Sequence, residues 1–185
     1  PTCKPLRLWL EKHRAPMTMF DPSNSWTDPS FTITEMVPAG PEGLQAISDL
    51  IDPSMSDPSW GQQWIDADAE ATTVIDEILD NETLLQPAVA RELGRRLPKD
   101  HLLYVSNSMA VRDVDSFLES RSDRLVVHGN RGASGIDGMI SSAAGAAASG
   151  QPTTLLIGDL AFQHDLGGLV AAINDEPTLT IVVVE

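Results

Sequence analysis

A glycine and an aspartate follow a short apolar run near the end of the chain, in the order that anion-binding turns use. Gly158 and Asp159 come directly after the run Thr-Leu-Leu-Ile at 154–157 and precede a segment with a helical pattern. Such a turn lets backbone approach a phosphate, and the helix start supplies free N–H groups and partial positive charge. The Asp159 carboxylate is suited to a hard cation such as Mg²⁺. The turn therefore predicts a site for a phosphate-bearing ligand and a metal ion.

Two more polar clusters also follow short apolar runs. Ser-Asn-Ser at 106–108 comes after 102–105, and a stretch with four glycines at 128–138 comes after 125–127. Ligands of open parallel sheets bind at the carboxyl ends of the strands. If these runs are strands of one such sheet, the three clusters converge on a single edge and form one site.

Two arginines in these clusters are candidates for binding an anionic ligand. Arg112 lies four residues after Ser108, which places both on one face at the start of a helix. Arg131 lies in the glycine-rich stretch, where Ile136 could also pack against a ligand. A guanidinium group binds carboxylates through two parallel hydrogen bonds. These residues therefore predict an oxyanion or carboxylate clamp.

Each motif also has an interpretation as ordinary structure. The turn at 158–159 can be a capped helix start, and the stretch 128–138 a flexible loop. Ser108 can be a helix N-cap, with Arg112 in a surface ion pair. The glycines of 128–138 lack the order, and the following acidic residue, that a dinucleotide fold requires.

The second half of the chain alternates strand-like and helix-like segments. Strands are predicted at 102–105, 125–127, 153–157 and 179–184, and helices at 108–118, 135–149 and 166–174. This alternation predicts an α/β fold, an open parallel sheet with helices on both faces.

The first half is interpreted as the end of a second α/β domain, followed by a linker. Residues 1–40 are the predicted remnant, with a helix at 4–14 and strands at 17–20 and 31–37; residues 41–58 are the linker, and 59–185 the next domain. That domain is predicted to open with helices at 59–79 and from 82 or 83 to 97. The first carries an apolar stripe with Trp60 and Trp64, expected in a core or an interface.

Composition argues against several classes of protein. A formal net charge of −15 disfavours a nucleic-acid partner, and no apolar run approaches the ~20 residues of a membrane span. The single Cys3 excludes an internal disulfide framework and indicates a reducing, cytoplasmic compartment. A start without Met and a motif cut short at Glu185 are interpreted as signs of a fragment.

Three runs together resemble one family. They are Ser-Asn-Ser-Met-Ala-Val-Arg-Asp at 106–113, Asn-Arg-Gly-Ala-Ser-Gly-Ile-Asp-Gly at 130–138 and Gly-Asp-Leu-Ala-Phe-Gln-His-Asp-Leu at 158–166. They are similar to runs in the 2-succinyl-5-enolpyruvyl-6-hydroxy-3-cyclohexene-1-carboxylate synthases of menaquinone biosynthesis, which are thiamine-diphosphate enzymes. The resemblance covers 100–185 strongly and earlier residues weakly, and it implies a truncated C-terminal diphosphate-binding domain.

The resemblance implies an activity and a set of site residues. The family adds the succinyl unit of 2-oxoglutarate, after decarboxylation, to isochorismate. By resemblance, Asp159 binds Mg²⁺ or Mn²⁺, and Ile136 holds thiamine diphosphate in its bent form. The other cofactor-binding residues would be Gly158, Leu160 and Ala161. The catalytic residues would be Ser108, Arg112 and Arg131, and these bind the substrates together with Asn107.

The resemblance also implies partners and leaves gaps. The family's site needs a pyrimidine-binding domain from a partner subunit, within a homodimer or homotetramer. The glutamate of that domain and a second metal-binding Asn are absent from this sequence, so the chain alone is expected to be inactive. Ala161 and Gly167 stand where many relatives carry Ser and Asn.

Two alternatives stay open. One is another thiamine-diphosphate enzyme of the acetohydroxyacid-synthase type. Arg112 and Arg131 argue against it, because small neutral donors need no carboxylate clamp. The other is a non-catalytic α/β binding module, since a fold does not fix a function.

Overall fold

The computed structural model describes residues 4–50, 52, 54, 57–81, 85–132, 134–175 and 178–185. The chain divides into two compact units, Pro1–Ile75 and Asp76–Glu185, and each is described by itself. The domain limits predicted at 40 and 58 stay a prediction. The predicted helix start at 82 or 83 lies outside the described residues.

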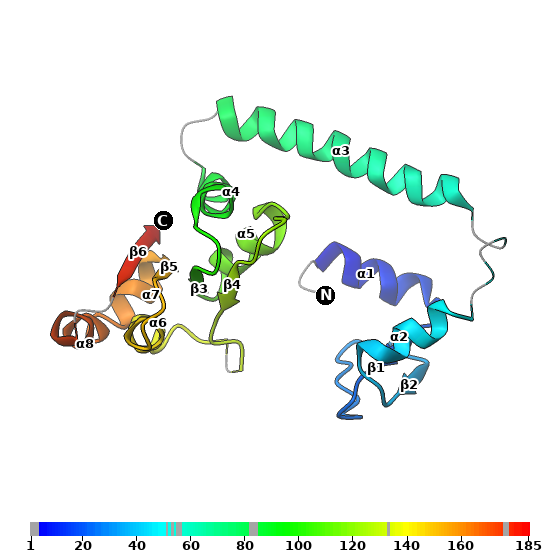
Figure 1. Cartoon of the computed structure of the whole chain (residues 1–185), viewed down its shortest axis with the longest axis horizontal. Coiled ribbons are helices and arrows are strands. Elements are labelled where there is room, and N and C mark those ends of the chain that lie inside the picture. Colours follow the sequence, from blue (N-terminus) through cyan, green and yellow to red (C-terminus); the bar gives the residue numbers. More distant parts are fainter. Residues whose placement is uncertain are drawn as a thin grey trace. The chain divides into compact units, whose positions relative to one another are not determined.

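The second unit is built on a four-stranded parallel sheet (Figure 1). Its strands are β3 (Leu102–Val105), β4 (Val126–His128), β5 (Thr153–Gly158) and β6 (Leu179–Val184), in the spatial order β4-β3-β5-β6. Every pairing is parallel. All four predicted strands are confirmed, with β4 shifted by one residue. Their apolar runs are continuous because the central strands are buried on both faces.

Helices cover both faces of this sheet, as predicted. Alternate side chains of β3 point to opposite sides: Leu103 and Val105 belong to one core cluster, Leu102 and Tyr104 to another. The first cluster packs against α4 (Gln86–Arg96) and α5 (Met109–Phe117). The second packs against α6 (Met139–Ala148), α7 (Asp159–His164) and α8 (Gly168–Asp175). The α/β fold class is therefore confirmed.

The strand order creates a switch point between β3 and β5. β4 pairs with one side of β3 and β5 with the other. The helix that follows β3, α5, packs on one face, whereas the helix that follows β5, α7, packs on the other. Such a reversal opens a crevice at the carboxyl ends of the two strands, where open α/β sheets bind ligands.

Two helix predictions in this unit need correction. The helix predicted from 135 begins at Met139, because Gly138 has a left-handed φ of +64° and ends the loop there. The Asp165 carboxylate accepts hydrogen bonds from the Ser141 backbone N–H at 2.8 Å and its hydroxyl at 3.1 Å, so this helix start is capped from a distant segment. The single helix predicted over 166–174 is preceded by a separate one, α7.

The first unit holds a small parallel pair of strands between helices. Its elements are α1 (Lys4–His13), β1 (Thr18–Phe20), β2 (Glu35–Val37) and α2 (Pro41–Ser48). Thr18 lies opposite Glu35 in the pair. The strand predicted over 31–37 is confirmed only at Glu35–Val37, and Phe31, with a φ of +53°, lies outside the conformation that strands adopt.

The long helix α3 (Pro58–Asn81) spans the division between the units. Its predicted stripe is not buried in the core of the described chain. Trp60 and Trp64 stack edge to face at 5.9 Å but stay 65% and 64% exposed. Neither this helix nor any other in the described ranges combines the length and the apolarity needed to cross a membrane.

Candidate functional site

A pocket of about 220 Å³ lies at the carboxyl ends of the strands, at the switch point. Every site residue predicted from the sequence lines it except the two arginines. The residues brought together are Asn107, Ser108, Ile136, Gly158, Asp159, Leu160 and Ala161. The three polar clusters thus converge on one site, while the role of each residue stays a prediction.

The Gly158–Asp159 turn forms one wall of the pocket. Gly158 is extended, with φ −75° and ψ 156°, and Asp159 is the first residue of α7. Apart from its chain neighbours, no residue in the described ranges lies within 4 Å of the point where a β-carbon on Gly158 would stand, so the backbone there is open to a ligand. The partial positive charge of a helix start favours an anion at this wall.

The donor set of the pocket suits a metal ion that is shared with a ligand. Asp159 and Glu185 are the acidic residues of the lining. In the ranges that the structure describes, no three His, Cys, Asp or Glu side chains gather in a metal-binding group. Mg²⁺ commonly uses one or two carboxylates and takes its remaining ligands from phosphate and water. The residues present therefore fit a metal–diphosphate pair better than a metal held by protein alone.

Ser108 has an unusual backbone at the start of α5. Its φ of 69° and ψ of −123° lie in a region that residues other than glycine rarely adopt. It occupies the N-cap position, but its side chain makes no capping hydrogen bond. The capping interpretation is therefore wrong for the hydroxyl. Strain of this kind gathers at functional sites, where the surrounding structure enforces it.

A hydrogen-bond network holds the glycine-rich loop over the end of β3. The Asn107 side-chain amide donates to the backbone oxygens of Asn130 and Gly135, at 3.2 and 2.6 Å. The Tyr104 hydroxyl donates to Asn130 Oδ1 at 2.6 Å, and Asn130 Nδ2 donates to Ser142 Oγ at 3.1 Å. The loop is thereby tied to both β3 and α6.

Neither arginine lines the pocket, but each contacts a residue that does. Arg131 donates from Nη1 to Asn107 Oδ1 at 2.6 Å. Arg112 Nη1 lies 4.0 Å from the sulfur of Met109. Each is exposed and touches a residue that lines the pocket. The surface ion pair considered for Arg112 is absent from the described part of the chain.

Sequence reasoning missed several residues of the lining, namely Gln86, Met109, Ala110, Val184 and Glu185. Met109 and Ala110 fall inside the run 106–113, in which the sequence predicts Asn107, Ser108 and Arg112 as site residues. Gln86 lies far upstream, at the start of α4, and its side chain donates to the backbone oxygen of Glu185. Most of these five further lining residues are apolar, which suits an organic ring beside a charged group.

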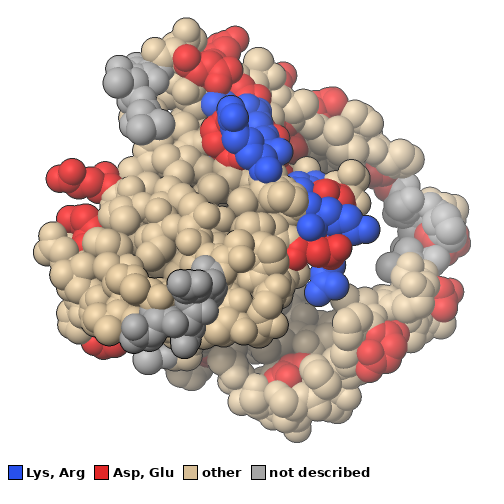
Figure 2. Space-filling view, turned by 60° about the vertical axis from the view of Figure 1, so that its left-hand side comes forward, with Lys and Arg blue, Asp and Glu red and all other residues tan. Residues whose placement is uncertain are grey.

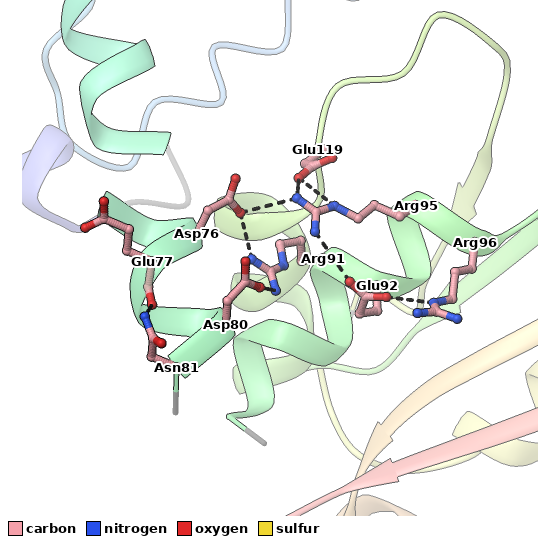
Figure 3. A network of polar contacts seen from close by, with 9 residues as sticks. All are labelled: Asp76, Glu77, Asp80, Asn81, Arg91, Glu92, Arg95, Arg96 and Glu119. Atoms are coloured by element: carbon pink, nitrogen blue, oxygen red, sulfur yellow. Dashed lines mark hydrogen bonds and ion pairs between the residues drawn. The ribbon is translucent and has the colours of Figure 1, made fainter. Parts of the chain in front are cut away.

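An ion-pair network joins α4, which begins with Gln86, to α3 and to Glu119 beyond the end of α5 (Figure 3). Arg91 is 5% exposed and binds Asp76 at 2.7 Å and Asp80 at 2.6 Å, both on α3. Arg95 pairs with Glu119, and this hydrogen bond raises the pKa of the guanidinium. On the face shown in Figure 2, basic side chains lie beside acidic ones rather than in a broad basic area.

Eight known proteins similar to this chain share one name. A 2-succinyl-5-enolpyruvyl-6-hydroxy-3-cyclohexene-1-carboxylate synthase of Geobacillus kaustophilus is 38% identical over 183 residues, which are 98% of this chain and 32% of the synthase. The synthases of Listeria innocua and Halobacterium salinarum are 38% and 39% identical over the whole chain, and 32% and 31% of their lengths are covered. No protein-family model matches.

This chain is homologous to one segment of these synthases. It spans about a third of the length of the curated relatives that it matches. The resemblance noted in the three motif runs is thus confirmed, and it extends upstream over the first unit, where the runs alone gave only a weak signal.

Proposed function

We propose that this chain is the diphosphate-binding part of a 2-succinyl-5-enolpyruvyl-6-hydroxy-3-cyclohexene-1-carboxylate synthase. The synthase would add the succinyl unit of 2-oxoglutarate, after decarboxylation, to isochorismate. One observation carries the proposal. The motif runs that resemble the synthases, from three separate strand ends, line a single pocket at the switch point of the sheet.

The pocket residues suit thiamine diphosphate and Mg²⁺ or Mn²⁺. Asp159 would hold the metal, and the helix start at Leu160 and Ala161 would face the diphosphate. Ile136 would support the organic rings from the apolar wall. When bound, the cofactor supplies the nucleophilic carbon and accepts the electron pair released by decarboxylation.

The protein's own contribution is orientation and charge neutralisation. Both proposed substrates are dicarboxylates, and the chain is strongly acidic, so cations must be placed at the pocket mouth. Arg112 and Arg131 each contact a residue of the lining, and we propose them for this role. Their guanidinium groups would bind substrate carboxylates, with Ser108 as a nearby hydroxyl donor. The apolar wall would exclude water from the reacting atoms.

The proposal includes a partner. The family's second half-site is a pyrimidine-binding domain from another subunit, within a homodimer or homotetramer. A glutamate from that domain activates the cofactor ring in these enzymes. We therefore expect no turnover from this chain by itself, and the measurement is product formation from 2-oxoglutarate and isochorismate by the purified chain.

The decisive experiment uses the complete protein and the variant Asp159→Asn. Thiamine diphosphate is titrated calorimetrically with and without Mg²⁺, and 2-oxoglutarate and pyruvate are compared as donors. We expect tight Mg²⁺-dependent binding in the natural protein and a loss of about 100-fold or more in the variant. Asp137→Asn is the control, because that carboxylate is 83% exposed and outside the lining.

Each alternative predicts a different result. A preference for pyruvate would favour an enzyme of the acetohydroxyacid-synthase type. Absence of Mg²⁺-dependent binding in the complete natural protein would favour a non-catalytic module. Unchanged binding in Asp159→Asn would refute the assigned metal ligand.

A further inference from the structure

The side chain of Asn107 is buried in the pocket wall, and its amide is committed to other parts of the protein. Only 5% of the residue is exposed. Its Nδ2 donates to the backbone oxygens of Asn130 and Gly135, and its Oδ1 accepts from Arg131. A side-chain amide has two N–H donors, and both are used here. Asn107 thus links Asn130 and Gly135 of the loop through hydrogen bonds, and it also binds Arg131.

A second set of hydrogen bonds fixes the same loop to β3 and α6. Tyr104, on β3, is 8% exposed and donates its hydroxyl to Asn130 Oδ1 at 2.6 Å. The Nδ2 of Asn130 donates to Ser142 Oγ on α6 at 3.1 Å. Asn130 is therefore bound through its side chain to a strand and a helix, and through its backbone to Asn107. Buried hydroxyl and amide groups are costly when unpaired, so these contacts favour one position of the loop.

Two functional candidates depend on where this loop lies. Arg131 directly follows Asn130, and Ile136 directly follows Gly135. Each is therefore next in sequence to a residue whose backbone oxygen is bound by Asn107. Ile136 stands in the pocket lining. The loop also lies against the end of β3 at Gly129, where an added β-carbon would be 2.7 Å from the Val105 backbone oxygen.

We propose that Tyr104, Asn107 and Asn130 are positioning residues that hold loop residues 129–132 and 134–138 over the carboxyl end of β3. Held in this way, the loop keeps Ile136 in the pocket wall and the Arg131 guanidinium beside Asn107. Asn107 then acts through the loop, since its amide is already engaged, and not by contacting substrate. The effect on cofactor and substrate rests on the proposed function, whereas the holding of the loop does not.

The holding of the loop is tested on this chain by amide hydrogen exchange of peptides that cover 129–138. Tyr104→Phe removes one hydroxyl, and Asn107→Asp replaces the two donated hydrogen bonds with a carboxylate that faces two carbonyl oxygens. Ser134→Ala is the matched control, because the Ser134 hydroxyl donates only within the loop, to the Arg131 backbone oxygen. Urea unfolding of each variant checks that the fold persists.

We expect exchange in the loop to be about tenfold faster in Tyr104→Phe and faster still in Asn107→Asp, with no change in Ser134→Ala. Exchange in β5 and β6 should stay as in the natural chain. Equal exchange in Tyr104→Phe, Asn107→Asp and the control would overturn the proposal. So would a rise spread evenly over the whole sheet, because that would be a loss of general stability.

The consequence for the site is tested on the complete protein, with the same variants. We expect Tyr104→Phe to weaken Mg²⁺-dependent thiamine diphosphate binding and to raise the KM for 2-oxoglutarate several-fold, while Ser134→Ala changes neither. If amide exchange in the loop rises but the affinity for thiamine diphosphate and the KM for 2-oxoglutarate stay unchanged, the link between the loop and the site is overturned. If the natural protein binds no cofactor, the proposed function fails, and the exchange result still decides whether these residues hold the loop.

Discussion

Replacing Gly129 with alanine tests how tightly the loop rests on the sheet. An ideal β-carbon at this position would lie 2.7 Å from the Val105 backbone oxygen, whereas real β-carbons essentially never come within 3.0 Å of another atom. The loop and the strand would have to part by at least about 0.3 Å. Val105 is 2% exposed and is paired with Leu156 on the neighbouring strand, so its carbonyl has little room to move.

The expected cost follows from this overlap. Overpacking against a fixed neighbour typically costs about 1–3 kcal/mol, and a contact with backbone in a central strand belongs in the middle of that range. At about 2 kcal/mol, the thermal midpoint of a unit of this size would fall by about 10 °C. Gly132→Ala is the matched control, since no described residue other than its chain neighbours comes within 4 Å of a β-carbon there. We expect it to change stability by less than about 0.5 kcal/mol.

The assay is urea unfolding of the two variants and the natural chain, followed by circular dichroism. The slope of the unfolding free energy against urea should be the same in all three, so that a lower midpoint reports lower stability. A Gly129→Ala midpoint equal to that of Gly132→Ala would refute the reasoning, because it would mean that the loop lifts off the strand without cost.

Three further predictions concern single side chains. Ser108→Gly should stabilise the chain by up to about 1 kcal/mol relative to Ser108→Ala, because glycine adopts a positive φ without strain; equal unfolding midpoints would contradict this. Asp165→Ala should destabilise by about 1 kcal/mol through loss of the cap on α6, with faster amide exchange at Ser141; an unchanged Ser141 rate would count against the cap. Burial lowers the pKa of His101 below 6.5, so the neutral form is favoured in the fold and stability should decline as the pH falls from 7.5 towards 5.5. His101→Gln should flatten that decline in urea midpoints measured across the same range, and a folded-state pKa above 6.5 by NMR would show the sign to be wrong.

The sheet and the general location of the site could be predicted because their signals are local. Each central strand is a continuous apolar run, and each polar cluster follows such a run directly. Parallel pairing then brings the clusters to one edge whatever the details of packing. The sequence alone therefore predicts the convergence of Asn107, Ile136 and Asp159 on one pocket.

The details that failed depend on partners far away in the chain. The start of α6 is set by Asp165, about two dozen residues later, and no window around 135–149 contains that information. Gln86 reaches the pocket because Arg91 and Arg95 dock α4 against its neighbours, which no motif near Gln86 reveals. Arg131 is held by the Asn107 side chain, a contact between residues 24 positions apart, and its role in substrate binding stays a prediction.

The strand order also bears on how the chain folds. β3 stands between β4 and β5, and none of its pairings can be closed by a short hairpin because all of them are parallel. Each closure needs a crossover through a helix, so the entropy of a long loop is lost before any strand contact forms. The pocket draws on the ends of β3, β5 and β6 at once, so it is complete only when all three strands are in place. A ligand that binds there would therefore report complete folding of this unit and would favour the folded state through mass action.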